Sequence, residues 1–224
     1  MSWEPANKTV KFLITLLFFA AAFAYIEADV VVYLRAIFYK DGFVFQITNF
    51  KNDPVFAKYL TFEIGRETAT LVLIFTSCIL IEKNFRRRLA VFLLIFAIWD
   101  IFYYIWLKVL IDWPISLMDW DILFLIPSVW AGPVLAPLIS SLTMLLIAFI
   151  ALSEIDITVT RPKALAFALA VAMIIVGFCK AGMHIDRHNY NNYFSWPLFV
   201  IWHVFIVSNV YCCINKPLKG YGRK

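Results

Sequence analysis

Long apolar runs recur along the chain, with only short polar segments between most of them. Six of these runs reach the length of about 20 residues that an α-helix needs to cross the hydrocarbon core of a bilayer. They cover approximately residues 11–33, 60–81, 89–111, 131–152, 164–183 and 196–214. The pattern predicts an all-α fold, in which residues 1–224 form a single integral membrane domain with six transmembrane helices.

The segment between the third and fourth apolar runs has a different pattern. Residues 112–130 begin with polar positions, but residues 122–126 are strongly apolar. Trp113, Trp120 and Trp130 flank this short stretch, and amphipathic aromatic side chains settle at the membrane interface. We expect an interfacial or re-entrant segment here, either as a simple aromatic-belt loop or as a lid over the helices.

The composition is typical of a membrane protein and excludes several other classes of protein. Hydrophobic residues make up 63% of the chain, charged residues 16%, and the mean hydropathy is +0.82, well above that of a soluble globular domain. The 7 glycines and 9 prolines are too few for a collagen-like or low-complexity chain. The net charge of +5 does not indicate a nucleic-acid partner, because the basic residues follow the membrane topology. The lipid bilayer and other membrane subunits are the expected partners.

The distribution of Lys and Arg predicts the orientation in the membrane. Of the 20 basic residues, 12 fall on one side of the six predicted spans. These are Lys8, Lys11, Lys83, Arg86, Arg87, Arg88, Arg161, Lys163, Lys216, Lys219, Arg223 and Lys224. Because cytoplasmic segments carry an excess of Lys and Arg, we expect both termini to be cytoplasmic, in a bacterial inner membrane.

Ionisable side chains gather in the outer halves of the predicted spans. The main members of this layer are Glu27, Glu63, Arg66, Glu67, Asp100, Lys180, His184 and His203. Such groups are costly within a bilayer, and they mark functional sites, pathways or buried pairs. Their shared depth predicts one polar pocket that opens to the outside. Glu67 and Asp100 are the candidate catalytic residues, because a carboxylate can act as a general base.

Histidine spacing points to a metal ion in this pocket. His184 and His188 would lie one helical turn apart if the fifth helix continued past residue 183, and His203 would approach from the neighbouring span. Glu27 and Glu63 would add oxygen ligands. This mixed set suits zinc, iron or manganese, and a haem held by His184 and His203 ranks lower. The sequence thus favours a metal-dependent membrane enzyme that acts on a lipid-soluble or membrane-proximal substrate.

A structural ion-pair network is the main alternative. Arg66 could neutralise Glu63 and Glu67, and Arg35 lies about two turns from Glu27 on one helix face. Lys108 or Lys180 could pair with Asp100. Such a protein would be a non-catalytic subunit, an anchor or an assembly factor of a larger membrane complex.

Two further interpretations have less support. A transporter would explain Gly132, Pro133 and Pro137, which interrupt the predicted fourth span as in discontinuous transporter helices, but the inner halves of the spans lack a polar path. A serine nucleophile beside His203 is weaker still. Ser140 and Ser141 lie toward the middle of that span without flanking glycines.

Overall fold

The structure is a computed structural model that describes residues 6–39, 45, 54–153 and 155–214. Six helices are long and apolar enough to cross a membrane. They are α1 (Ala6–Phe38), α2 (Pro54–Ile81), α3 (Phe85–Ile111), α4 (Leu135–Leu152), α5 (Arg161–Gly182) and α6 (Trp196–Cys213). Each predicted span overlaps one helix, so the prediction of six helices long and apolar enough to cross a membrane is confirmed. The basic residues after position 214 lie outside the described residues.

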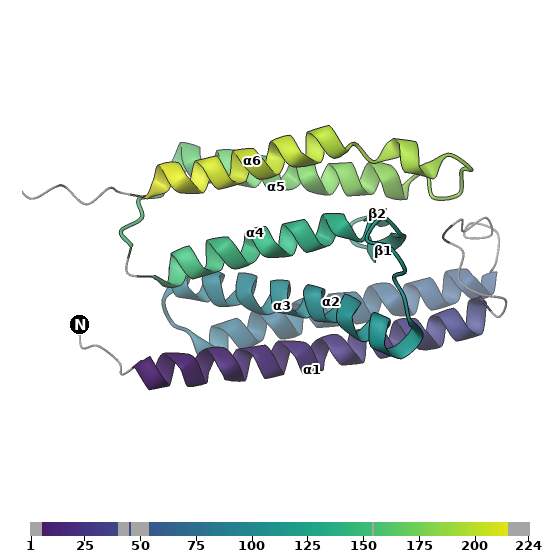
Figure 1. Ribbon diagram of the computed structural model, residues 1–224, viewed down its shortest axis with the longest axis horizontal. Helices are drawn as coiled ribbons and strands as arrows, with labels where there is room; N and C mark the ends of the chain where they lie inside the picture. The colour runs from purple at the N-terminus through teal and green to yellow at the C-terminus, as the bar shows by residue number, and fades with distance from the viewer. Residues whose placement is uncertain (1–5, 40–44, 46–53, 154, 215–224) are drawn as a thin grey trace, which may run out of the picture.

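The helices run along the long axis of the molecule (Figure 1). The start of α1 and the end of α6 lie at the same end of the bundle, which we call the terminal end. Toward the opposite end, two short strands, β1 (Trp120–Phe124) and β2 (Trp130–Pro133), connect α3 to α4. We call this the hairpin end. A single 3₁₀ turn (Tyr190–Tyr193) precedes α6 there.

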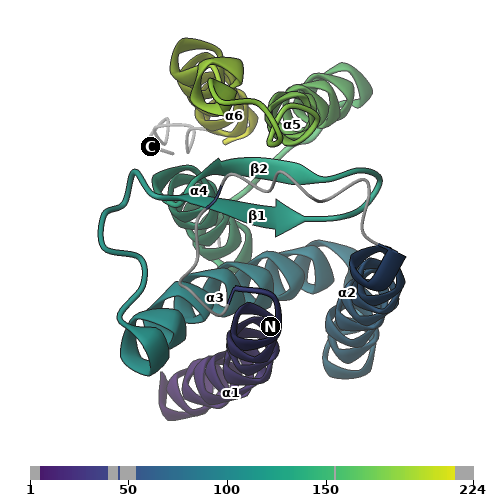
Figure 2. The ribbon, with the colours of Figure 1, turned by 90° about the vertical axis from the view of Figure 1, so that its right-hand side faces the viewer.

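Helix α3 is central, because it packs against α1, α2 and α4. Helix α5 packs mainly on α6 and on β2. Figure 2 shows the hairpin between α3 on one side and the α5–α6 pair on the other. The hairpin therefore joins two groups of helices that have few direct contacts near it.

The hairpin corrects two sequence-based expectations. The expected interfacial or re-entrant segment is an antiparallel β-hairpin in which Trp120 pairs with Pro133 and Asp121 with Gly132, so the all-α prediction omitted a small sheet. Because residues 130–133 form β2, helix α4 begins at Leu135 instead of residue 131. Pro137 lies in the first turn of α4, where proline is tolerated. The interruption that favoured a transporter is absent from α4.

Small residues bring α1 close to α3. Ala20, Ala24 and Ala28 recur every four residues on one face of α1, and all three have an exposed fraction of 0%. A stripe of small side chains lets two membrane helices approach closely. The indole N–H of Trp106 on α3 donates to the carbonyl of Ala21 at 2.8 Å. The same face of α1 continues toward the hairpin end, where it carries polar residues.

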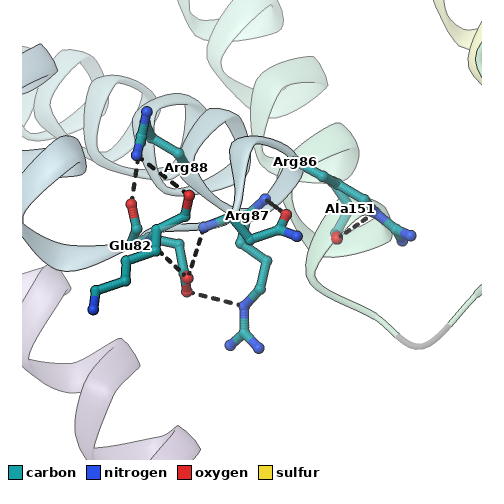
Figure 3. Close-up of polar contacts among 7 residues, drawn as sticks. Glu82, Arg86, Arg87, Arg88 and Ala151 are labelled. Carbon is teal, nitrogen blue, oxygen red and sulfur yellow. Dashed lines mark hydrogen bonds and ion pairs between the residues drawn. The ribbon is translucent and has the colours of Figure 1, made fainter.

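Arginine side chains organise the terminal end (Figure 3). Arg86 donates to the carbonyls of Ala151, Ser153 and Ile155 at 3.0, 3.2 and 2.9 Å, and thereby caps the C-terminus of α4. Arg88 donates to the carbonyl of Glu82 at 3.1 Å. The sequence analysis used these arginines only to predict the orientation in the membrane. In the structure, Arg86 also holds the start of α3 against the end of α4.

Candidate functional site

A cavity of about 150 Å³ lies between α1, α2, α3 and β1, in the half of the bundle nearer the hairpin. We call it the polar cavity. Its charged lining residues are Glu27, Arg35, Glu63, Arg66, Glu67, Asp100 and Asp121. The structure therefore brings the four carboxylates singled out in the sequence (Glu27, Glu63, Glu67 and Asp100) to one cavity, and adds a fifth from β1.

Arg66 on α2 forms ion pairs with two of these carboxylates. Its Nη1 pairs with Glu27 on α1, and its Nε lies 2.7 Å from Oε2 of Glu63, one turn earlier on α2. Glu27 is buried, and a buried carboxylate persists when it is paired and hydrogen-bonded. The sequence placed Arg66 between Glu63 and Glu67, whereas the structure links it to Glu63 and to the neighbouring helix.

Arg35 on α1 pairs with Asp121 on β1 instead of with Glu27. Its Nη2 lies 3.2 Å from Oδ1 of Asp121, and its guanidinium stacks over the ring of Trp113, 3.8 Å from the centroid. The hydroxyl of Tyr103 donates to Oδ2 of Asp121 at 3.3 Å. Burial raises the pKa of the Asp121 carboxyl, while the adjacent guanidinium opposes this shift. This ion pair attaches the hairpin to α1.

Glu67 and Asp100 differ from the other carboxylates, because neither forms an ion pair with a described residue. Oε2 of Glu67, whose residue is 8% exposed, accepts the backbone N–H of Leu125 at 2.9 Å. Oδ2 of Asp100 accepts the hydroxyl of Ser141 at 2.7 Å. A carboxyl group in a cavity without a neutralising cation is well placed to exchange a proton with a bound molecule.

Trp99 forms part of the wall of the polar cavity and is 5% exposed. Its indole Nε1 is fully buried and has no hydrogen-bond partner within the described part of the chain. Buried polar groups are nearly always hydrogen-bonded, so this N–H is an exception within the cavity wall.

A second cavity of about 380 Å³ lies between α3, α4, α5, α6 and the hairpin. We call it the apolar cavity, because hydrocarbon side chains form nearly all of its wall. Asp100 and Leu123 line both cavities. Ser140, Ser141 and His203 supply further polar groups.

His203 lies in the apolar cavity and makes two hydrogen bonds. Its Nδ1 is 2.9 Å from the carbonyl of Phe199, and its Nε2 is 3.1 Å from Oγ of Ser140. Because a carbonyl only accepts, Nδ1 carries the proton. The single hydroxyl hydrogen of Ser140 has two acceptors within reach, Nε2 of His203 and the carbonyl of Ala136 at 3.2 Å. The sequence offered little support for a serine beside His203, but the structure does place Ser140 within hydrogen-bonding distance of His203. Unlike His184 and His188, His203 lines the apolar cavity.

The other two histidines do not form the expected helical set. Helix α5 ends at Gly182, so the continuation past residue 183 that would place His184 and His188 one helical turn apart does not occur. His184 stacks on Tyr193 with ring centroids 3.7 Å apart, and His188 is exposed. Among residues 6–39, 45, 54–153 and 155–214, no group of three or more His, Cys, Asp or Glu side chains could hold a metal ion. The structure gives the predicted metal site no support.

The lysines expected beside Asp100 lie elsewhere. Lys108 pairs with Asp112 at 2.6 Å, on an exposed part of α3, and Lys180 is exposed on α5. Glu27, Glu63 and Asp121 therefore form ion pairs, as the structural-network interpretation expects. Glu67 and Asp100 form none among the described residues and stay the candidates for a functional site.

Comparison with known proteins found no match: no family model fits the chain, and neither a curated protein nor a solved structure is significantly similar to it.

Proposed function

We propose that this protein is an integral membrane enzyme that acts on a lipid-soluble or membrane-proximal substrate in the polar cavity. One observation carries the proposal: Glu67 and Asp100 line the same intramembrane cavity without a cation partner among the described residues. Carboxyl groups in a low-dielectric site are suited to general acid–base chemistry. Their roles are to accept a proton from the bound molecule and to donate one to it.

The contacts around these two groups support this role. Each carboxyl uses one oxygen for a neutral hydrogen bond, to the Leu125 N–H or the Ser141 hydroxyl. The other oxygen accepts no hydrogen bond from a described residue, and it can face a substrate. Arg66 and Arg35 fix α1, α2 and β1 around the cavity through their ion pairs. A rigid frame of this kind holds catalytic groups in place.

The proposed orientation puts the polar cavity on the non-cytoplasmic side of a bacterial inner membrane, with both termini inside. The basic segments at the terminal end support it, because cytoplasmic loops are rich in Lys and Arg. A cysteine-free background with Ser116→Cys should react with a membrane-impermeant maleimide on intact cells. The same background with Lys83→Cys should react only after permeabilisation. The reverse pattern would overturn the orientation.

The enzyme proposal is tested by incubating the detergent-purified protein with a total lipid extract of its host membrane. Mass spectrometry should show a lipid that is consumed and a product that appears with time. Glu67→Gln and Asp100→Asn should abolish this conversion, whereas Glu82→Gln, a carboxylate at the terminal end, should retain it. Conversion that survives both cavity variants would contradict the proposal.

A non-catalytic subunit of a membrane complex is the second candidate. The observation that favours it is the pairing of three of the five cavity carboxylates with Arg35 and Arg66, as in a purely structural network. It predicts that the protein copurifies with fixed partner subunits under mild detergent, and that Glu67→Gln leaves this assembly and its activity unchanged.

A further inference from the structure

The apolar cavity is elongated along the helix axes. On α5 its wall includes Phe167, Val171, Ile174 and Phe178, which share one helix face, and also Ile175. These residues span 11 positions, or roughly 16 Å at the helical rise per residue. On α4, Ser140 and Ile147 lie on a facing stripe of the wall. The cavity therefore runs in the direction that lipid chains follow in a bilayer.

The polar cavity meets the apolar cavity at Asp100. On α3, Phe92, Phe96 and Asp100 lie one turn apart on the apolar wall, and Phe92 is nearest the terminal end. Asp100 also lines the polar cavity. The lining is therefore charged on the polar-cavity side of Asp100. From Asp100 toward the terminal end, it consists mainly of hydrocarbon side chains.

We propose that the apolar cavity binds the hydrocarbon chain of a membrane amphiphile whose polar end lies in the polar cavity, with Asp100 at the junction. The proposal rests on the function proposed above and names its substrate class. A water-filled cavity with this lining is unfavourable, whereas lipid chains are as apolar as its wall. The chain runs between the stripes of α4 and α5.

The lining of the polar cavity indicates the chemistry of the polar end. Five carboxyl groups and two guanidinium groups face it. This excess of carboxyl groups favours an amine or a hydroxyl group over a phosphate or a carboxylate, because like charges in a desolvated site repel.

The test uses two photoactivatable probes, hexadecylamine and hexadecanoic acid, each with a diazirine near the chain end. The full-length protein in detergent is irradiated with each probe, and the modified residues are mapped by peptide mass spectrometry. We expect hexadecylamine to label residues of the apolar cavity, such as Met144, Phe167 and Val171, and unlabelled hexadecylamine to compete. The acid should label them several-fold less.

A matched pair of variants on α5 separates the cavity from the lipid-facing surface. Val171→Trp fills the cavity and should reduce labelling several-fold, whereas Leu169→Trp, on the 59% exposed outward face, should not. Labelling that is confined to outward positions, or that unlabelled hexadecylamine does not displace from the unmodified protein, would overturn the proposal. Equal labelling by hexadecanoic acid and hexadecylamine would overturn the preference for an amine or a hydroxyl group at the polar end.

Failure of this proposal is distinguishable from failure of the proposed function. Labelling of the cavity without any turnover of membrane lipids would uphold the chain site and contradict the enzyme. Turnover that Val171→Trp leaves intact in a folded protein would contradict the chain site and uphold the enzyme.

Discussion

Asp100 on α3 accepts a hydrogen bond from the hydroxyl of Ser141 on α4, with the two oxygens 2.7 Å apart. This contact lies at the junction of the two cavities, because Asp100 lines both. It holds a carboxyl group within the bundle without a charged partner among the described residues. The polar and apolar parts of the proposed site therefore meet at one side chain that can exchange a proton.

Glu67→Gln should separate stability from activity. The glutamine Oε1 can still accept the N–H of Leu125, which Glu67 accepts at 2.9 Å, so the melting temperature in detergent should change little. Loss of an acid–base group lowers turnover by about 10²–10⁴-fold. Parallel thermal unfolding and lipid-conversion assays check this, and a large loss of stability with unchanged specific activity would contradict it.

Arg66→Met should destabilise the bundle strongly. It removes the cation that pairs with Glu27 and Glu63, and an unpaired buried charge costs about 3–5 kcal/mol. Arg66→Lys should recover part of this loss, because it keeps the charge but not the forked geometry. The control is Arg87→Met, whose ion pair with Glu82 is largely exposed and is worth at most about 1 kcal/mol. Equal unfolding free energies for Arg66→Met and Arg87→Met would refute this role.

The Arg35–Asp121 pair should show coupling between α1 and the hairpin. A double-mutant cycle with Arg35→Met and Asp121→Asn measures the interaction free energy directly. We expect about 1–3 kcal/mol, because both side chains are buried. The matched cycle on the exposed pair Lys108 and Asp112 should give less than about 1 kcal/mol. Strictly additive effects at Arg35 and Asp121 would show that the pair does not fasten the hairpin.

Gly182→Ala should disturb the contact between α5 and the hairpin. A Cβ at Gly182 would lie 1.9 Å from the carbonyl oxygen of Val129, so one of the two backbones must move. The control on the same helix is Gly177→Ala, where nothing lies within 4 Å and helix propensity favours alanine by up to about 1 kcal/mol. Thermal unfolding should rank Gly182→Ala well below Gly177→Ala, and similar stabilities would contradict the tight contact.

The sequence predicted the helices well because hydrocarbon thickness fixes the length of a membrane span. The carboxylates Glu27, Glu63, Glu67 and Asp100 came together as expected, since they recur at one depth in successive antiparallel helices. These two signals depend only on length and position along the chain, and they need no knowledge of which helices are neighbours.

The hairpin and its ion pair were not predictable in the same way. Residues 122–126 form a short apolar run, which periodicity alone cannot assign to strand or helix. The partner of Arg35 lies 86 positions away and depends on the register of β1. Once residues 120–124 are known to form a strand, alternation places Asp121 on the opposite face from Trp120 and Ile122.

The predicted histidine cluster failed for a different reason. It required α5 to continue beyond residue 183, but the helix ends at Gly182, where the backbone closely approaches the hairpin. Hydropathy does not record such a contact. His203 instead makes hydrogen bonds with Ser140 and with the carbonyl of Phe199, and it lines the apolar cavity.

The central claim, that Asp100 acts chemically at the junction of the cavities, is tested most directly by comparing lipid conversion in two variants of one contact. Asp100→Asn removes the proton-exchanging group, whereas Ser141→Ala removes only its hydrogen-bond donor. We expect Asp100→Asn to abolish conversion of the membrane lipid extract and Ser141→Ala only to reduce it. Full conversion by a folded Asp100→Asn protein would show that Asp100 has no chemical role.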